Sequence, residues 1–195
     1  MHIVFVHGIF NTGRVFALMA RDARNHGLIP HTPSLRKADG RLPVAKLAEQ
    51  LRHVIETHVP IGEKCLLVGF SMGGIVARYY LQMLDGVNRV ERFIAIGSPH
   101  EGSVMAYFLP SVFFPGAKDL RPQSKVLCDL QDTSHQLNEL PIMALYNPID
   151  TMIVPPRSAD WKGVPSFSSG WNFHPFMPFS PKVRSMMWEF LLAAQ

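Results

Sequence analysis

The sequence of 195 residues has few cysteines and few charged side chains, and each shortage excludes a class of protein. Only two cysteines are present, Cys65 in an apolar run and Cys128 in a polar segment, without the spaced partners of a disulfide framework. We therefore expect two buried or inert thiols in a reducing compartment. Charged residues make up 17% and hydrophobic residues 47%, which is an ordinary globular composition and argues against disorder.

Long hydrophobic runs, dense basic clusters and metal-binding patterns are also missing. No stretch approaches the roughly 20 apolar residues that span a bilayer. The start, MHIVFVHG, lacks the charged and apolar regions of a secretory signal, so we expect a cytoplasmic protein, although a mature secreted chain would begin in the same way. The net charge of +4 is scattered, which disfavours nucleic-acid binding but allows transient contact with an anionic membrane surface. Without ligand spacing such as H-E-x-x-H, no metal or cofactor is expected. The oligomeric state is left open.

Short apolar runs that alternate with helical periodicity indicate the fold class. The runs predict strands at 2–6, 28–33, 64–68, 92–96, 142–146 and 164–168, and apolar positions three and four residues apart predict helices at 14–25, 44–55, 72–83 and 183–191. Strands that are apolar on both faces belong to parallel sheets that helices cover on both sides. We expect one α/β domain over residues 1–195, with a mostly parallel sheet of about six strands.

One segment does not fit this alternation. Residues 103–118, SVMAYFLPSVFFPGAK, are apolar and aromatic, are interrupted by prolines, and lie between two predicted strands. Functional insertions often occupy such places, so the segment is predicted to form a lid or part of an acyl pocket. A plain packed helix is the alternative.

The motif GFSMG at residues 69–73 matches G-x-S-x-G and predicts a nucleophile at Ser71. The pattern needs a buried strand before it and a helix after it, because the serine must sit on a sharp turn between the two. The apolar run CLLV precedes the motif and the helical stripe of 72–83 follows it. The alternative is that Ser71 only caps the helix, but a cap does not require a glycine two positions away on each side.

Acyl transfer also needs two N–H donors for the oxyanion that develops in the transition state. One donor is predicted at Met72, directly after the nucleophile, and the other in a loop that follows an early strand. FVHGIFNTG at residues 5–13 supplies such a strand and loop.

Four segments, VHGIF, VGFSMGG, IGSPHEGS and PIDTMIVP, resemble the α/β-hydrolase superfamily and, within it, the small bacterial lipases and esterases. They are spread over most of the chain, in the family's order. The resemblance implies that Ile9 is the second oxyanion donor and that His7 is a structural part of its loop. It also makes His100, in the segment IGSPHEGS, a residue that shapes a loop rather than a base.

The order of the triad in this fold, serine then acid then histidine, selects the remaining two catalytic residues. Asp150 follows a predicted strand and the turn Asn147-Pro148, where catalytic groups of parallel sheets are found. His174 is the only histidine beyond that acid. The other histidines that follow Ser71 are His100 and His135. The other acids considered, Asp119, Asp129 and Asp132, have helical or polar surroundings and are predicted to lie on solvated faces.

Apolar residues near the triad predict the kind of substrate. If the fold is as expected, Phe10, Phe173, Phe176 and Met177 gather near Ser71 and line an acyl pocket, with ordinary core packing as the alternative for each. Phe173 also stands where small lipases often have a glycine, so the family pattern does not predict the conformation of this loop. The sequence thus predicts a serine hydrolase of carboxylic or lipid esters with apolar acyl groups. A thioesterase or amidase on the same triad and a non-catalytic relative that binds a lipid or a partner are the alternatives.

Overall fold

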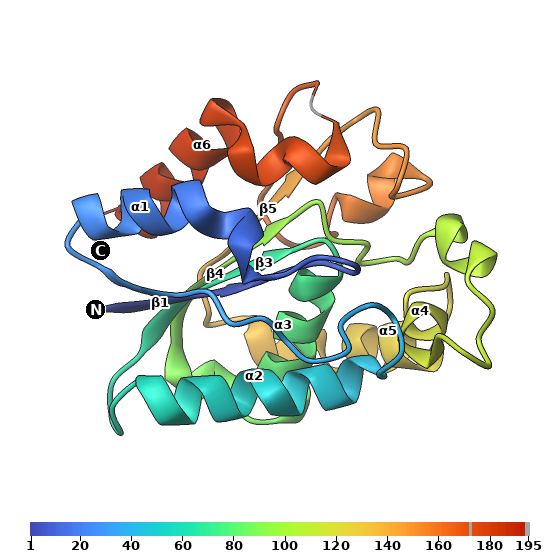
Figure 1. Cartoon of the computed structure of the whole chain (residues 1–195), viewed down its shortest axis with the longest axis horizontal. Coiled ribbons are helices and arrows are strands. Elements are labelled where there is room, and N and C mark those ends of the chain that lie inside the picture. The colour runs from blue at the N-terminus through green and yellow to red at the C-terminus, as the bar shows by residue number, and fades with distance from the viewer. Residues whose placement is uncertain (172, 194–195) are drawn as a thin grey trace.

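The computed structural model describes residues 1–171 and 173–193 and contains one six-stranded sheet (Figure 1). Its strands are all parallel and follow the order β2-β1-β3-β4-β5-β6. Their bounds are β1 (His2–Val6), β2 (Ile29–His31), β3 (Cys65–Phe70), β4 (Val90–Ile96), β5 (Ile142–Tyr146) and β6 (Ser166–Ser168). The parallel α/β fold expected from the sequence is confirmed.

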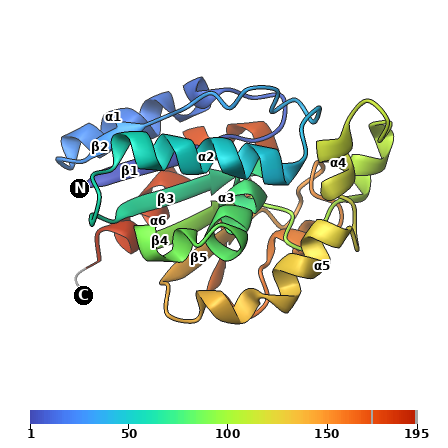
Figure 2. The same ribbon diagram turned by 90° about the horizontal axis from the view of Figure 1, so that it is seen from below.

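Helices cover both faces of the sheet, as Figures 1 and 2 show. On one face lie α1 (Ala17–Asn25), which continues a 3-10 helix at Gly13–Phe16, and α6 (Pro181–Leu191). On the other face lie α2 (Val44–His58), α3 (Met72–Met83) and α5 (Lys125–Asp132). Within the described residues, no helix has both the length and the apolar character needed to cross a membrane.

Alternation along each strand assigns its side chains to the two faces. In β1, Val4 and Val6 pack against the α2–α3 layer, whereas Ile3 and Phe5 pack against the α1–α6 layer, and all four are completely buried. A strand buried on both faces has no polar side to expose, which explains its continuous apolar sequence. The ends of these rigid strands hold the loops described below.

Residues 103–118 do not form a single packed helix. They contain a 3-10 helix at Val104–Phe108, a turn, and the short α4 (Pro115–Asp119). Pro110 and Pro115 lack a backbone N–H, so a continuous helix across them would lose hydrogen bonds. α4 and the turn before it project beside the carboxyl edge of the sheet (Figure 2).

The two cysteines differ in their surroundings. Cys65 is buried in β3, and burial raises the pKa of its thiol to about 12. Cys128 is exposed on α5, so of the two thiols expected to be buried or inert only Cys65 is buried. The apolar run around Cys65 signalled its burial, whereas the polar segment around Cys128 gave no such signal.

Candidate active site

Ser71 occupies the turn between β3 and α3, with φ 54° and ψ −127°. A non-glycine residue rarely adopts this backbone conformation, which costs about 1–3 kcal/mol and persists only where the surroundings impose it. A Cβ at Gly69 would lie 2.5 Å from the Cα of Gly74, and a Cβ at Gly73 would overlap the carbonyl oxygen of Val6. The two glycines of the motif are therefore needed for close packing of the turn.

The side chain of Ser71 does not cap α3. Ser71 stands at the N-cap position, but its hydroxyl accepts no capping hydrogen bond. Its backbone N–H donates to the carbonyl oxygen of Ile96 at 2.8 Å, which fixes the turn to β4. The residue is 7% exposed and borders a cavity, so its Oγ is free to meet a ligand.

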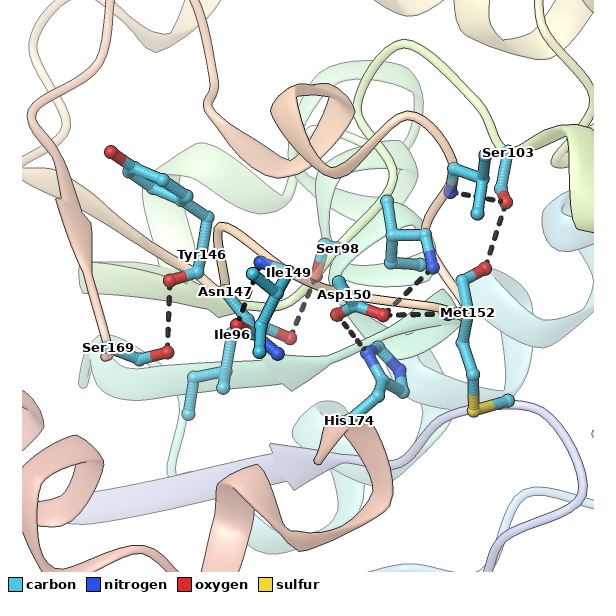
Figure 3. Close-up of polar contacts among 12 residues, drawn as sticks. Ile96, Ser98, Ser103, Tyr146, Asn147, Ile149, Asp150, Met152, Ser169 and His174 are labelled. Atoms are coloured by element: carbon cyan, nitrogen blue, oxygen red, sulfur yellow. Dashed lines mark hydrogen bonds and ion pairs between the residues drawn. The ribbon is translucent and has the colours of Figure 1, made fainter. Parts of the chain in front are cut away.

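The predicted acid and base are in contact. Nδ1 of His174 lies 2.6 Å from Oδ2 of Asp150, and both side chains are almost fully buried (Figure 3). Oδ1 of Asp150 accepts hydrogen bonds from the backbone N–H groups of Met152 at 2.8 Å and Ile153 at 3.0 Å. An ionised carboxylate accepts only, so Nδ1 is the donor in this contact; in a neutral imidazole with the proton on Nδ1, Nε2 carries the lone pair.

The imidazole of His174 also lies beside the residue that precedes Ser71. Its ring stacks on that of Phe70, the residue before Ser71, with 5.1 Å between centroids. Nε2 is buried and has no hydrogen-bond partner among the described residues, Ser71 included. Catalytic hydrogen bonds are often long without substrate. The arrangement leaves the basic nitrogen available next to the turn that carries Ser71.

A loop after β1 places a further backbone amide near the serine. A Cβ at Gly8 would lie 2.8 Å from the Cβ of Ser71, so the loop passes directly beside that residue. A turn closes where Asn11 N–H donates to Gly8 O at 3.3 Å, with Phe10 at φ 56°. Among the described residues, the backbone N–H groups of Ile9 and Met72 donate no hydrogen bond. Both are therefore available as donors.

His7 holds this loop in place. Its Nδ1 donates to Gly8 O at 2.9 Å, and its Nε2 accepts from the backbone N–H of Leu35 at 2.9 Å. Burial lowers its pKa. Both ring nitrogens of His7 are thus used within the scaffold, as a structural histidine requires.

The carboxyl ends of β4 and β5 are tied together by Ser103, which the sequence did not single out. Its Oγ donates to Met152 O at 2.9 Å and accepts from Val154 N–H at 3.0 Å (Figure 3). It also accepts from Met105 N–H at 3.3 Å and so caps the 3-10 helix. Ser103 joins the loop that holds Asp150 to the segment that borders the cavity.

An apolar cavity of about 200 Å³ opens next to Ser71. Phe10 lines it, as predicted, and so does Ile9. The 103–118 segment and the two loops beside it supply most of the remaining wall, through Pro99, Ser103, Met105, Ala106, Leu109, Ala117, Leu120, Met152 and Ile153. Most of these residues were not singled out from the sequence, although the apolar 103–118 segment was the signal that pointed to them.

The other residues predicted for the pocket lie elsewhere. Phe173 and Phe176 are 62% and 61% exposed and do not line the cavity. Met177 is completely buried in the core between the sheet and α6. Phe173 precedes the 3-10 helix His174–Phe179, which contains Phe176 and Met177. One acid was also misplaced: Asp119 is half-buried, and its Oδ2 accepts from Val44 N–H at 2.8 Å, at the start of α2.

His100 is completely enclosed and lies apart from the Asp150–His174 pair. Its ring stacks on Trp161 at 4.0 Å, and neither ring nitrogen has a partner in the described residues. The guanidinium of Arg78 lies 4.6 Å from the centre of the same tryptophan. Burial and then the charge of Arg78 hold the pKa of His100 well below its usual range. A histidine that stays neutral and enclosed in this way is structural.

This burial predicts how stability depends on pH. Below about pH 6.5 the unfolded chain binds a proton at His100 that the folded chain refuses, so the free energy of unfolding falls by up to about 1.4 kcal/mol per pH unit. His100→Phe keeps the ring on Trp161 and removes this loss. Urea denaturation at pH 7 and pH 5 should show that wild type loses at least about 1 kcal/mol more than the variant. Equal losses in wild type and variant would contradict the assignment of His100 as a buried histidine that stays neutral.

Comparison with known proteins identifies the family. The sequence model of the palmitoyl protein thioesterase family matches residues 2–139. The chain belongs to that family. The matched region contains Ser71, Ile9 and Met72, whereas Asp150 and His174 lie beyond it. It thus belongs to the α/β-hydrolase superfamily, whose fold it shares with esterases and lipases of known structure.

Curated relatives of this palmitoyl protein thioesterase family member are similar over part of their length. It is 32% identical over 108 residues to the sn-1-specific diacylglycerol lipase ABHD11 of Danio rerio. This alignment covers 48% of this chain and 30% of the relative. It is 33% identical over 108 residues to the lysosomal thioesterase PPT2 of Mus musculus, which covers 51% and 34%. The chain spans about a third of the length of these relatives.

Solved structures share the fold over nearly the whole chain. A gene product of Listeria innocua superposes with a TM-score of 0.76 at 15% identity, which covers 100% of this chain and 95% of the other. The mature Bacillus licheniformis lipase BlEst2 gives 0.73 at 20% identity, with 98% and 91% covered. An esterase from Exiguobacterium antarcticum superposes with a TM-score of 0.72 at 14% identity, which covers 99% of this chain and 92% of the other.

Proposed function

We propose that the protein is a serine hydrolase that cleaves esters of apolar acyl groups through an acyl-enzyme. The observation that carries the proposal is that Ser71, held at positive φ on a strand-to-helix turn, borders an apolar cavity and stands beside the buried Asp150–His174 pair. A binding protein would need the cavity but not the strained serine or the buried carboxylate–imidazole pair.

The mechanism follows from these contacts. Nε2 of His174 takes the proton of Ser71 as Oγ attacks the carbonyl carbon, and Asp150 stabilises the imidazolium through Nδ1–H. The amides of Ile9 and Met72 donate to the oxyanion of the tetrahedral intermediate. The imidazolium then protonates the leaving group, and an acyl-enzyme remains on Ser71. A water molecule that gives its proton to the same imidazole hydrolyses the acyl-enzyme.

The size of the cavity predicts a dependence on acyl length. At roughly 30 Å³ per water-sized group, about 200 Å³ accommodates an acyl chain of about six carbons. Each buried methylene contributes about 0.8 kcal/mol, or roughly fourfold. We expect kcat/KM for p-nitrophenyl esters to rise about three- to fourfold per methylene from acetyl to hexanoyl and then to level off. A constant value from acetyl to hexanoyl would contradict this use of the cavity.

A thioester is the second candidate substrate, because the family and the PPT2 relatives are named as thioesterases. An alcohol and a thiol leave from the same tetrahedral intermediate, so the two chemistries share the site. Hexanoyl oxyester and hexanoyl thioester, assayed side by side on the wild type, separate the readings. A kcat/KM at least tenfold higher for either substrate would assign the leaving group.

A covalent probe tests the proposed nucleophile directly. A fluorophosphonate should label the wild type at Ser71, as mapped by mass spectrometry of the digested protein. Ser71→Ala should not be labelled, whereas Ser111→Ala, which changes a serine outside the cavity lining, should be labelled normally. A wild type that takes no label and turns over no acyl length would overturn the proposal and favour a non-catalytic protein.

A further inference from the structure

The cavity opens through a rim of exposed apolar side chains. Phe10 and Met152 line the cavity and yet are 61% and 40% exposed. Further exposed apolar side chains lie on the 103–118 segment, where Phe108 ends the 3-10 helix and Val112 and Phe113 lie in the turn; they are 78%, 85% and 69% exposed. Apolar surfaces of this kind mark binding sites more often than they occur by accident.

The loops that carry these residues share one edge of the molecule. Phe10 follows β1, the 103–118 segment follows β4, and Met152 follows β5, all at the carboxyl edge of the parallel sheet (Figure 1). We call Phe10, Phe108, Val112, Phe113 and Met152 the mouth face.

Positive charge borders the mouth face. Lys37 and Arg41 lie in a shallow pocket that Phe10 also lines, and exposed Lys118 follows Ala117 of the cavity wall. The nearby carboxylate of Asp39 is paired with Arg41. Lys37 and Lys118 enter no ion pair formed by the described residues. Apolar side chains with two unpaired lysines beside them match the two layers of an anionic membrane surface, acyl chains below and phosphates above.

We propose that the mouth face docks on the surface of an anionic phospholipid bilayer. Its aromatic side chains enter the acyl boundary while Lys37 and Lys118 contact lipid phosphates, so the cavity opens directly onto lipid. The inference rests on the proposed function for the use of this docking, since an acyl chain then reaches Ser71 without crossing water. The docking itself involves no chemical step.

Partition into vesicles tests the proposal independently of catalysis. Ser71→Ala should co-sediment with vesicles of phosphatidylcholine and phosphatidylglycerol at 7:3, and at least about tenfold less with pure phosphatidylcholine. On that background, Phe108→Asp with Phe113→Asp, and separately Lys37→Glu with Lys118→Glu, should each weaken the partition by about tenfold or more. If the wild type hydrolyses no ester but these variants bind vesicles as expected, the proposed function is contradicted and the docking proposal stands.

Matched controls come from the opposite edge of the sheet. Ile61, 97% exposed, and the exposed Lys64 both precede β3, so Ile61→Asp and Lys64→Glu change similar side chains away from the mouth face. These controls should bind vesicles as tightly as the parent. Equal weakening by the control and mouth-face variants, or no vesicle binding at all, would overturn the proposal.

A tryptophan reports the geometry of docking. Trp171, three residues before His174, is 83% exposed, whereas Trp161 and Trp188 are 3% and 8% exposed. Its fluorescence should shift to shorter wavelength with the anionic vesicles, and Trp171→Phe should abolish the shift. Self-association in light scattering that the Phe108→Asp, Phe113→Asp variant removes, without any vesicle-induced shift, would instead assign the mouth face to a second copy of the chain.

Discussion

Ser71→Ala should lower kcat/KM for the hexanoyl ester by about 10³-fold or more, which corresponds to a loss of about 4 kcal/mol of transition-state stabilisation. The reason is that no acyl-enzyme can form without Oγ, while the oxyanion donors and the cavity remain. Steady-state assays of the purified variant measure this loss, and active-site titration with the fluorophosphonate corrects the wild-type rate for inactive protein.

The same assay separates a triad from independent contributions. Because the three residues act as a unit, His174→Ala should lose nearly as much as Ser71→Ala, and the double variant should lose no more than either. His100→Phe is the matched control, since it replaces a buried histidine outside the site. A loss in His100→Phe equal to that in His174→Ala would mean that the wrong histidine has been assigned as the base.

Much of this site was predictable because its geometry is local. The turn at Ser71 is specified by the residues on either side of it, a buried strand, two small residues and a helical stripe, and all of these are visible in the sequence. Asp150 and His174 followed from chain order, since loops at the carboxyl ends of parallel strands meet at one edge. The hydrogen bond between them joins residues 24 positions apart and appears only in the folded chain.

The pocket was less predictable because its wall is assembled from distant segments. Met105 lies in the 3-10 helix Val104–Phe108, Leu120 directly follows α4, and Ile153 lies in the loop after β5, and no spacing in the sequence relates them. Met177 was expected to line the pocket near Ser71, but its side chain, in the 3-10 helix that begins at His174, lies in the core. Asp119 was likewise placed on a solvated face, whereas a contact 75 residues away gives it a partner at the start of α2.

Gly73→Ala should be the most destabilising single-methyl change in the turn. The added Cβ would overlap the carbonyl oxygen of Val6 and lie 2.7 Å from that of His7, so two backbone segments would have to separate. Such overpacking costs about 3 kcal/mol or more when the obstacle is backbone, because no side-chain rotamer relieves it. Urea denaturation followed by circular dichroism measures the loss.

Gly163→Ala is the matched control, because its Cβ would meet nothing within 4 Å. Gly163 has φ +81°, so alanine there carries only a backbone penalty of about 1–2 kcal/mol. If Gly73→Ala lowers the free energy of unfolding no more than Gly163→Ala, then β1 and α3 can move apart at little cost. The amides of Ile9 and Met72 would then be held only loosely relative to each other, and the oxyanion hole proposed here would lose its rigid support, since these donors depend on the close approach that Gly73 allows.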